Sequence, residues 1–137
     1  MTHGLFPFMP SPRSLPPEAA RVFDAALDAL ARTRERVAPR FAAAVDMLMD
    51  CSGKVVVTGV GKSGLAARKI AATLASTGCP AFFLNAGDAL HGDLGMVGDG
   101  DVVVMLSNNA NTAELAGMLP TLRRIGARTL GTFGRDD

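Results

Sequence analysis

Two hydrophobic patterns divide this chain near residue 52. Before that point, apolar side chains recur at the spacing of an α-helix, at Val22, Ala26, Leu30, Val37, Phe41, Val45 and Leu48. Pro39 interrupts the stripe, because proline lacks the N–H that a helix needs and disfavours helix at the residue before it. The pattern therefore predicts helical structure over 17–50, as two helices or as one bent helix.

Beyond Ser52 and Gly53, apolar residues form short continuous runs, at 55–57, 81–84, 102–106 and, more weakly, 129–133. Such runs are typical of strands buried on both faces. Helices are predicted between them over 65–76 and 113–125, and a loop over 85–100. Strands that alternate with helices predict an α/β three-layer sandwich, with a parallel sheet and helices on both faces.

The length of 137 residues suits one domain, which we expect over 17–137. Its helical part is 17–50 and its sheet-containing part is 52–137. An extended arm is predicted over 1–16, because prolines interrupt it at Pro7, Pro10, Pro12 and Pro16, and Pro17 follows directly.

Composition mainly excludes classes of partner. Fourteen Lys and Arg against thirteen Asp and Glu leave no net attraction to nucleic acid or membrane, and the chain has no Trp or Tyr on which bases could stack. A basic cluster at Arg32, Arg34, Arg36 and Arg40 is interpreted as a solvated helix face, with a polyanion-binding patch as the alternative.

Compartment signals favour a cytoplasmic protein. No apolar run approaches the roughly 18 residues of a membrane span, and the proline-broken start is no signal peptide. Cys51 and Cys79 fit neither a CxxC pair nor a disulfide framework, so we expect reduced thiols.

Ligands of parallel sheets bind beyond the carboxyl ends of the strands, which selects the loops 58–63, 85–95 and 107–112. The first matches G-x-G-x-x-G through Gly59, Gly61 and Gly64, yet Asn85 stands where a dinucleotide site needs an acidic residue. A sugar phosphate would not need this acidic residue, because the helix N-terminus and Lys62 both favour an anion. Alternatively, the glycines only permit a tight turn.

The other two loops carry further polar groups. His91, near Asp93, is either functional or structural, and a metal site would lack a third and fourth ligand. Residues 107–112 offer hydroxyls, amides and helix N–H groups that could cradle an anion. Alternatively, Thr112 or Asn111 is an N-cap with Glu114 as its capping partner.

Four motifs stand in order along the chain: 61–64, 71–78, 91–97 and 107–114. Together they closely resemble the arabinose-5-phosphate isomerases of the sugar isomerase (SIS) domain family, from about residue 52 to the end. The resemblance implies a homo-oligomer that interconverts ribulose 5-phosphate and arabinose 5-phosphate for the Kdo sugar of lipopolysaccharide or capsule. It implies no cofactor and no metal.

The resemblance also assigns residues. Lys62, Glu114 and His91 fall in the family's catalytic set, and the residues implied to bind substrate or phosphate are Gly61, Ser63, Ser107, Asn108, Asn109 and Thr112. Isomerisation needs a base and a group that stabilises an enediolate, for which Glu114 and Lys62 are suited. Either residue could instead orient the substrate.

The chain also departs from the family. Asn109, Ala110 and Asn111 replace Ser, Gly and Glu of the family's phosphate loop, which matters if position 110 needs a positive φ. Family members continue beyond the fourth strand with another catalytic glutamate and histidine, so we expect a fragment or a short paralogue without full isomerase activity. A non-catalytic phosphosugar-binding module and a dinucleotide-binding domain remain the alternatives.

Overall fold

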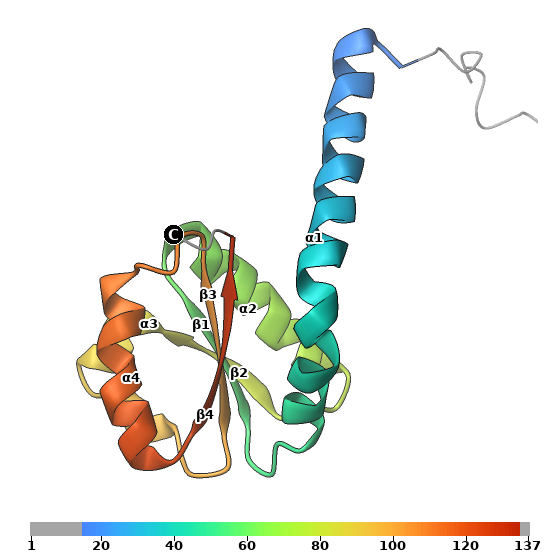
Figure 1. The fold of residues 1–137 in the computed structure, drawn as a ribbon. Helices are drawn as coiled ribbons and strands as arrows, with labels where there is room; N and C mark the ends of the chain where they lie inside the picture. The colour runs from blue at the N-terminus through green and yellow to red at the C-terminus, as the bar shows by residue number, and fades with distance from the viewer. Residues whose placement is uncertain (1–14, 135–137) are drawn as a thin grey trace, which may run out of the picture. The chain divides into compact units, whose positions relative to one another are not determined.

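The computed structural model describes residues 15–134, and the chain divides into two compact units, 1–41 and 42–137. The predicted arm over 1–16 falls almost wholly outside the described residues. Helices and strands follow in the order α1 (Pro17–Met49), β1 (Val55–Gly59), α2 (Gly61–Ser76), β2 (Ala81–Asn85), α3 (Ala86–Leu90), the 3-10 helix η1 (Asp93–Met96), β3 (Val102–Ser107), α4 (Ala113–Ile125) and β4 (Arg128–Phe133) (Figure 1).

Helix α1 is a single element of 33 residues that includes Pro39. The prediction of two separate helices is therefore wrong. None of its residues is buried, so water can bond the Glu35 carbonyl that Pro39 leaves without its helical N–H. The first unit contains α1 up to Phe41, and the last turns of α1 belong to the second unit.

The second unit is built on a four-stranded parallel sheet with the order β2-β1-β3-β4. Its central strand β1 pairs Val55 with Ala81 of β2 and with Val102 of β3. All five β1 residues are buried, whereas β4 forms an edge and is largely exposed. The chain thus reverses its direction of winding at β1, where open α/β sheets bind their ligands.

Helices cover both faces of this sheet, which confirms the predicted fold class (Figure 1). Successive side chains of a strand point to opposite faces, so Val55 and Val57 pack with α2 while Val56 packs with α3 and α4. Met47 and Leu48, from the last turn of α1, join the α2 side. Two apolar layers therefore hold β1 at the centre of the unit.

The predicted loop over 85–100 contains two short helices, so this part of the prediction is wrong. Asn85 is the N-cap residue of α3. Its Oδ1 accepts hydrogen bonds from the N–H groups of Gly87 and Asp88 at 2.8 and 3.3 Å. Ala86 and Ala89 are buried against the α4 side of the core. A cap and tertiary burial, rather than a repeated hydrophobic period, form this helix.

Asp101 ties the amino ends of β1 and β3 together. It is 2% exposed, and its two oxygens accept hydrogen bonds from the N–H groups of Lys54 and Gly98 at 2.7 and 2.8 Å. Burial alone would raise the pKa of Asp101, but these two bonds and the Lys54 ammonium, 3.4 Å away, lower it below its ordinary value. An ionised carboxylate therefore holds the amino ends of these two strands together, at the end of the sheet opposite the β1–α2 turn.

No helix within residues 15–134 is long and apolar enough to cross a membrane.

Candidate functional site

The connection from β1 to α2 is a single residue, Val60. Gly61 has a φ of +57°, which favours glycine. A Cβ on Gly59 would lie 2.9 Å from the Leu106 carbonyl oxygen, and one on Gly64 would lie 2.8 Å from the Gly59 carbonyl oxygen. The three glycines thus have a structural function, because they let the strand and helix meet closely.

A cavity of about 310 Å³ opens at this turn. Its lining comes from β1, β2 and the beginnings of α2, α3 and α4, and consists of Gly59, Val60, Gly61, Gly64, Leu65, Arg68, Phe83, Asn85, Gly87 and Glu114. Ligand sites of proteins start at roughly 300 Å³, so this cavity suits a small metabolite. It lies where the winding of the sheet reverses, as the fold class predicts.

Two side chains of opposite charge line the cavity. Glu114 is half-buried in the first turn of α4, where the positive end of the helix favours a carboxylate. Arg68 extends over the Phe83 ring, with its guanidinium carbon 4.2 Å from the ring centre. An acidic group and a fixed cation therefore share one small cavity.

Arg68 is not among the site residues predicted from the sequence. Gly61, Gly64, Leu65 and Arg68 follow the i, i+3, i+4, i+7 spacing of one helix face, and all four line the cavity. Counting along that face from the glycine turn would have found Arg68. The helix predicted from the sequence begins at Leu65, four residues after the observed start at Gly61, so the face shared by Gly61 and Arg68 is not evident from that prediction.

Lys62 and Ser63 lie in the first turn of α2, directly after Gly61. Neither is among the residues that line the cavity, and the Lys62 side chain is exposed. Of the residues assigned to substrate or catalysis, the cavity brings together Gly61 and Glu114.

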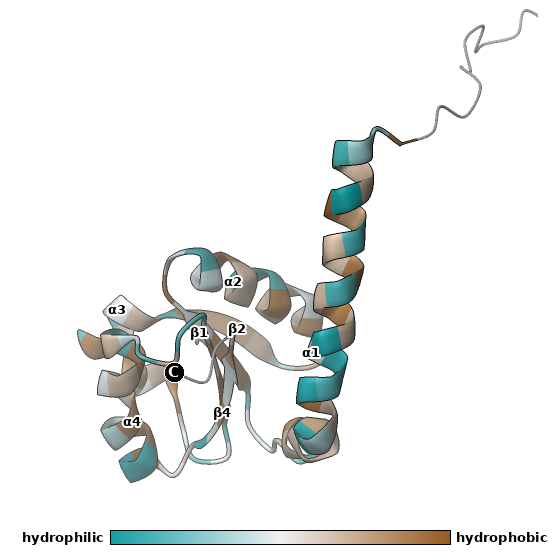
Figure 2. Cartoon of the chain, turned by 45° about the horizontal axis from the view of Figure 1, so that its top comes forward, coloured by the Kyte–Doolittle hydropathy of each residue, from teal (hydrophilic) through white to brown (hydrophobic). Residues whose placement is uncertain are grey.

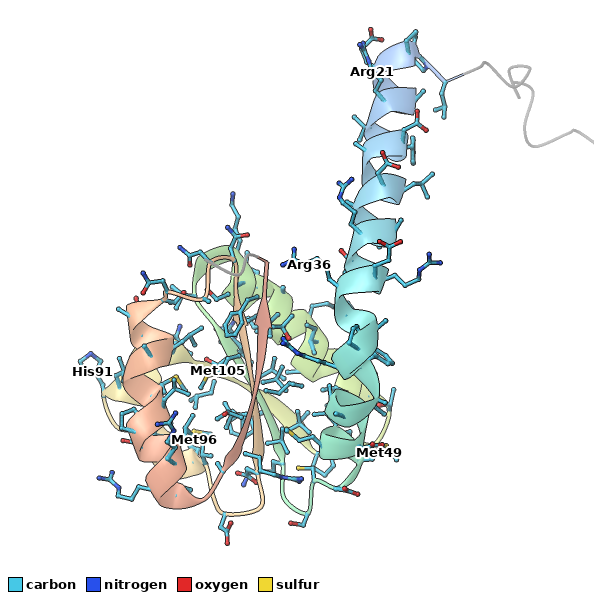
Figure 3. The ribbon with its side chains drawn as sticks, viewed as in Figure 1. Arg21, Arg36, Met49, His91, Met96 and Met105 are labelled. Carbon is cyan, nitrogen blue, oxygen red and sulfur yellow. The ribbon has the colours of Figure 1, made fainter. Side chains whose placement is uncertain are left out.

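His91 lies apart from this group. It is the exposed C-cap residue of α3, and its side chain points away from the sheet (Figure 3). Its neighbours Leu90 and Gly92 line a second, mostly apolar hollow of about 430 Å³ beside α4. The residues lining that hollow include Arg124 but no carboxylate, so it lacks the pair of opposite charges found in the first cavity.

The loop after β3 is closed by its own hydroxyls. The Oγ atom of Ser107 lies 2.7 Å from Oγ1 of Thr112 and 3.5 Å from the Asn109 amide oxygen, while Asn108 and Asn109 are exposed. Thr112 is the N-cap residue of α4 by position, but its side chain makes no capping bond. The predicted capping box with Glu114 is therefore not formed, and none of these loop residues lines the cavity.

Ala110 adopts a φ of +52° and is the sole non-glycine residue with a positive φ within 15–134. The Asn111 N–H bonds to the Asn109 carbonyl, which closes a tight turn around Ala110. This is the condition under which the family's glycine at this position matters, because a Cβ strains such a backbone. The departure from the family loop thus has a local energetic cost.

Two alternatives lose support from the structure. A dinucleotide-binding sheet has the order 3-2-1-4-5-6, whereas here β3 lies beside β1, and the amide oxygen of Asn85 caps α3. In the part of the chain that the structure describes, no three His, Cys, Asp or Glu side chains are grouped so that they could hold a metal ion.

Cys51 and Cys79 are free thiols.

Comparison with protein families gives a match to the SIS domain over residues 47–131. Arabinose 5-phosphate isomerase KdsD from Pseudomonas aeruginosa is 42% identical over 119 residues, which are 87% of this chain and 36% of that protein. The isomerase GutQ from Escherichia coli is 44% identical over 80% of this chain and 34% of its own length. This chain spans about a third of the curated relatives it matches.

Solved structures are also similar to this chain. A protein of E. coli CFT073, c3406, in complex with arabinose 5-phosphate, superposes with a TM-score of 0.71 at 41% identity, over 85% of this chain and 64% of that one. The phosphoheptose isomerase GmhA from Neisseria gonorrhoeae superposes with a TM-score of 0.73 at 16% identity, over 87% and 74%, and this likeness concerns the fold alone.

Proposed function

Since this chain belongs to the SIS domain family, we propose that it is the sugar-binding part of an aldose-ketose isomerase that interconverts D-ribulose 5-phosphate and D-arabinose 5-phosphate. The observation that carries the proposal is the cavity at the β1–α2 turn, in which Glu114 and Arg68 offer opposite charges. Its volume of about 310 Å³ is at the small end of the range for ligand pockets, which suits a small ligand such as a pentose phosphate.

The proposed chemistry uses Glu114 as the base. A carboxylate takes the proton from C1 of the ketose, the carbonyl electrons move onto O2, and an enediolate forms between C1 and C2. Return of the proton to C2 yields the aldose, while a proton passes from O1 to O2. Lys62, one residue beyond the cavity-lining Gly61, is proposed to stabilise the negative charge of the enediolate.

Substrate binding is proposed for the remaining assigned residues. The N–H groups at the start of α2, with Gly61 and Ser63, favour an anion. Ser107, Asn108, Asn109 and Thr112 are proposed to contact phosphate after the Ser107–Thr112 hydrogen bond opens. Arg68 is added as a cation that already faces the cavity. His91 is proposed to act near the substrate, although the structure holds it outside the cavity.

The second candidate is a phosphosugar-binding module without catalysis. Two observations favour it: Lys62 and His91 lie outside the cavity lining, and Ala110 occupies a strained position in the loop after β3. This alternative keeps the same ligand and the same cavity. Turnover separates the two candidates.

The test is to incubate the chain with D-ribulose 5-phosphate and follow formation of the aldose by ¹H NMR, with calorimetric titration of the same sugar in parallel. Aldose formation above background, lowered about 10²- to 10⁴-fold by Glu114→Gln, is the expected result for an isomerase. Glu35→Gln, which makes the same change on α1, is the matched control.

The outcomes of these two measurements are distinct. Binding without turnover would contradict the isomerase and support the binding module. Absence of both would contradict the proposed ligand. Assembly with further copies of the chain, and a cytoplasmic location, also remain proposals; the exposed apolar side chains of α1 support the first.

A further inference from the structure

The second cavity lies between α4 and the two short helices α3 and η1, which both contact α4 (Figure 1). Its volume is about 430 Å³, within the range of ligand sites. It shares no lining residue with the cavity at the β1–α2 turn. We call it the α4 hollow, and its lining consists of Ala89, Leu90, Gly92, Leu94, Gly95, Val97, Thr121, Arg124 and Ile125.

Core residues form the apolar part of the α4 hollow. Ala89, Leu94 and Val97 are 2%, 8% and 6% exposed and belong to the core on the α4 side of the sheet. Leu90 is 45% exposed, and a Cβ on Gly117 of α4 would lie 3.2 Å from its Cδ2 atom, so Leu90 packs directly on α4. An apolar group that enters the hollow therefore exchanges water for apolar contacts.

Two polar side chains of α4 complete the lining. Thr121 and Arg124 are three residues apart and so lie on one face of the helix. Figure 2 shows hydrophilic colour near the end of α4, where Arg123 and Arg124 lie. Within residues 15–134, Arg124 makes no ion pair and no hydrogen bond, and no carboxylate lines the hollow. One unpaired guanidinium thus lies beside an apolar cavity.

We propose that the α4 hollow binds a monocarboxylate with an apolar tail, such as a medium-chain fatty acid. The tail contacts Leu90, Leu94 and Val97, and the carboxylate accepts hydrogen bonds from the Arg124 guanidinium and the Thr121 hydroxyl. The planar fork of a guanidinium matches the two oxygens of a carboxylate. A mostly apolar lining with a few polar groups that orient the ligand is typical of small-molecule sites.

The end of α4 explains why a single negative charge fits best. The negative end of a helix disfavours an anion, so the affinity for the acid group depends on Arg124. The N–H groups of Gly126 and Ala127, just beyond the helix, already donate to the Leu122 carbonyl at 3.1 Å each. A phosphate dianion would therefore lack donors here, whereas one guanidinium and one hydroxyl suffice for a carboxylate.

The α4 hollow is separate from the candidate sugar site. Helix α3 stands between them, because its Gly87 lines the cavity at the β1–α2 turn while Ala89 and Leu90 line the hollow. Two different ligands therefore have room on one chain. The proposal does not depend on the isomerase activity, and neither would its failure affect that activity.

Titration of the ¹⁵N-labelled chain with hexanoate, followed by NMR, tests the site. Hexanoate is expected to bind with a Kd of about 1 mM and to shift the amide signals of residues 89–97 and 121–125. Hexanol lacks the carboxylate and inorganic phosphate lacks the tail, so each is expected to bind at least tenfold more weakly. No hexanoate binding up to about 20 mM, or equal affinity for hexanol or phosphate, would overturn the proposal.

Variants locate the head group. Arg124→Gln is expected to weaken hexanoate binding at least tenfold. Arg123→Gln removes the same charge from the neighbouring residue, which lies outside the lining, and is expected to leave binding unchanged. Equal losses in the two variants would contradict a specific carboxylate site. Arg68→Ala is also expected to have no effect, and a loss of hexanoate binding there would place the ligand in the first cavity and overturn the proposal.

A second pair of variants tests the tail. Leu90→Glu puts a carboxylate into the apolar lining and is expected to abolish hexanoate binding. Met96→Glu makes the same change at a residue of η1 that is 53% exposed and outside the lining, so binding should persist. Circular dichroism reports whether each variant stays folded. A folded Leu90→Glu variant that binds hexanoate as the wild type does would overturn the assignment.

Discussion

The guanidinium carbon of Arg68 lies 4.2 Å from the centre of the Phe83 ring. Arg68 comes from α2 and Phe83 from β2, and both line the cavity at the β1–α2 turn. The ring limits the positions of a long, otherwise flexible side chain, so less entropy is lost when Arg68 binds an anion. A cation that the sequence did not single out is thereby made ready at the candidate site.

Replacement of Arg68 by alanine is expected to weaken binding of ribulose 5-phosphate about tenfold or more, because a hydrogen bond to a charged group contributes roughly 1.5–3 kcal/mol. Calorimetric titration measures the change. Lys69→Ala removes the same charge from the next residue, which lies outside the cavity lining, and should leave affinity unchanged. Equal losses in both variants would mean that only overall charge matters.

Ala110→Gly should stabilise the loop after β3, since a non-glycine residue in the left-handed region costs about 1–2 kcal/mol. Part of this gain is offset by the greater freedom of glycine in the unfolded chain, so a net gain of up to about 1 kcal/mol is expected. Urea denaturation measures it. Ala113→Gly, placed in the first turn of α4, should destabilise instead. A loss of stability in Ala110→Gly would contradict the strain.

Asp101→Asn should lower the free energy of unfolding at pH 7 by about 1–3 kcal/mol, because Lys54 and Gly98 lose a charged acceptor. The folded pKa of Asp101 is lowered from 3.8, so its stabilisation is present above that pH and is lost as the pH falls through the folded pKa. The difference between wild type and variant should therefore shrink as the pH falls below 3.8. Exposed Asp99→Asn is the control, and a difference that does not change with pH would contradict this account.

Thr58→Val should stabilise the chain or leave it unchanged. Thr58 is fully buried in β1, and its hydroxyl is the one buried side-chain polar atom within 15–134 that has no hydrogen-bond partner. A buried hydroxyl without a partner costs about 1–3 kcal/mol, and valine has nearly the same shape. Ser107→Ala removes a hydroxyl that does have a partner, so it should destabilise by about 1 kcal/mol. Thermal unfolding of both variants makes the comparison, and a destabilised Thr58→Val would reveal a partner for this hydroxyl.

The strands and the two longer helices of the second unit could be predicted from sequence because each follows a local pattern. Continuous valine runs predict buried strands, and the structure has β1 and β3 there. The helix α3 could not be predicted in this way, since five residues hold no repeated period. It forms because Asn85 caps it and because Ala86 and Ala89 are buried against the core.

The sequence by itself determined the turn from β1 to α2, because the positive φ of Gly61 and the close approach of Gly64 to the Gly59 carbonyl oxygen are short-range requirements. Its ordered motifs also identified the SIS domain family, which the match over residues 47–131 confirms. Only the tertiary structure decided which side chains face the cavity. Arg68 and Glu114 reach it because α2 and α4 pack on opposite faces of one sheet, whereas the turn at the end of α3 directs His91 away. Such long-range packing sums many weak contacts between distant residues, so no single stretch of sequence specifies it.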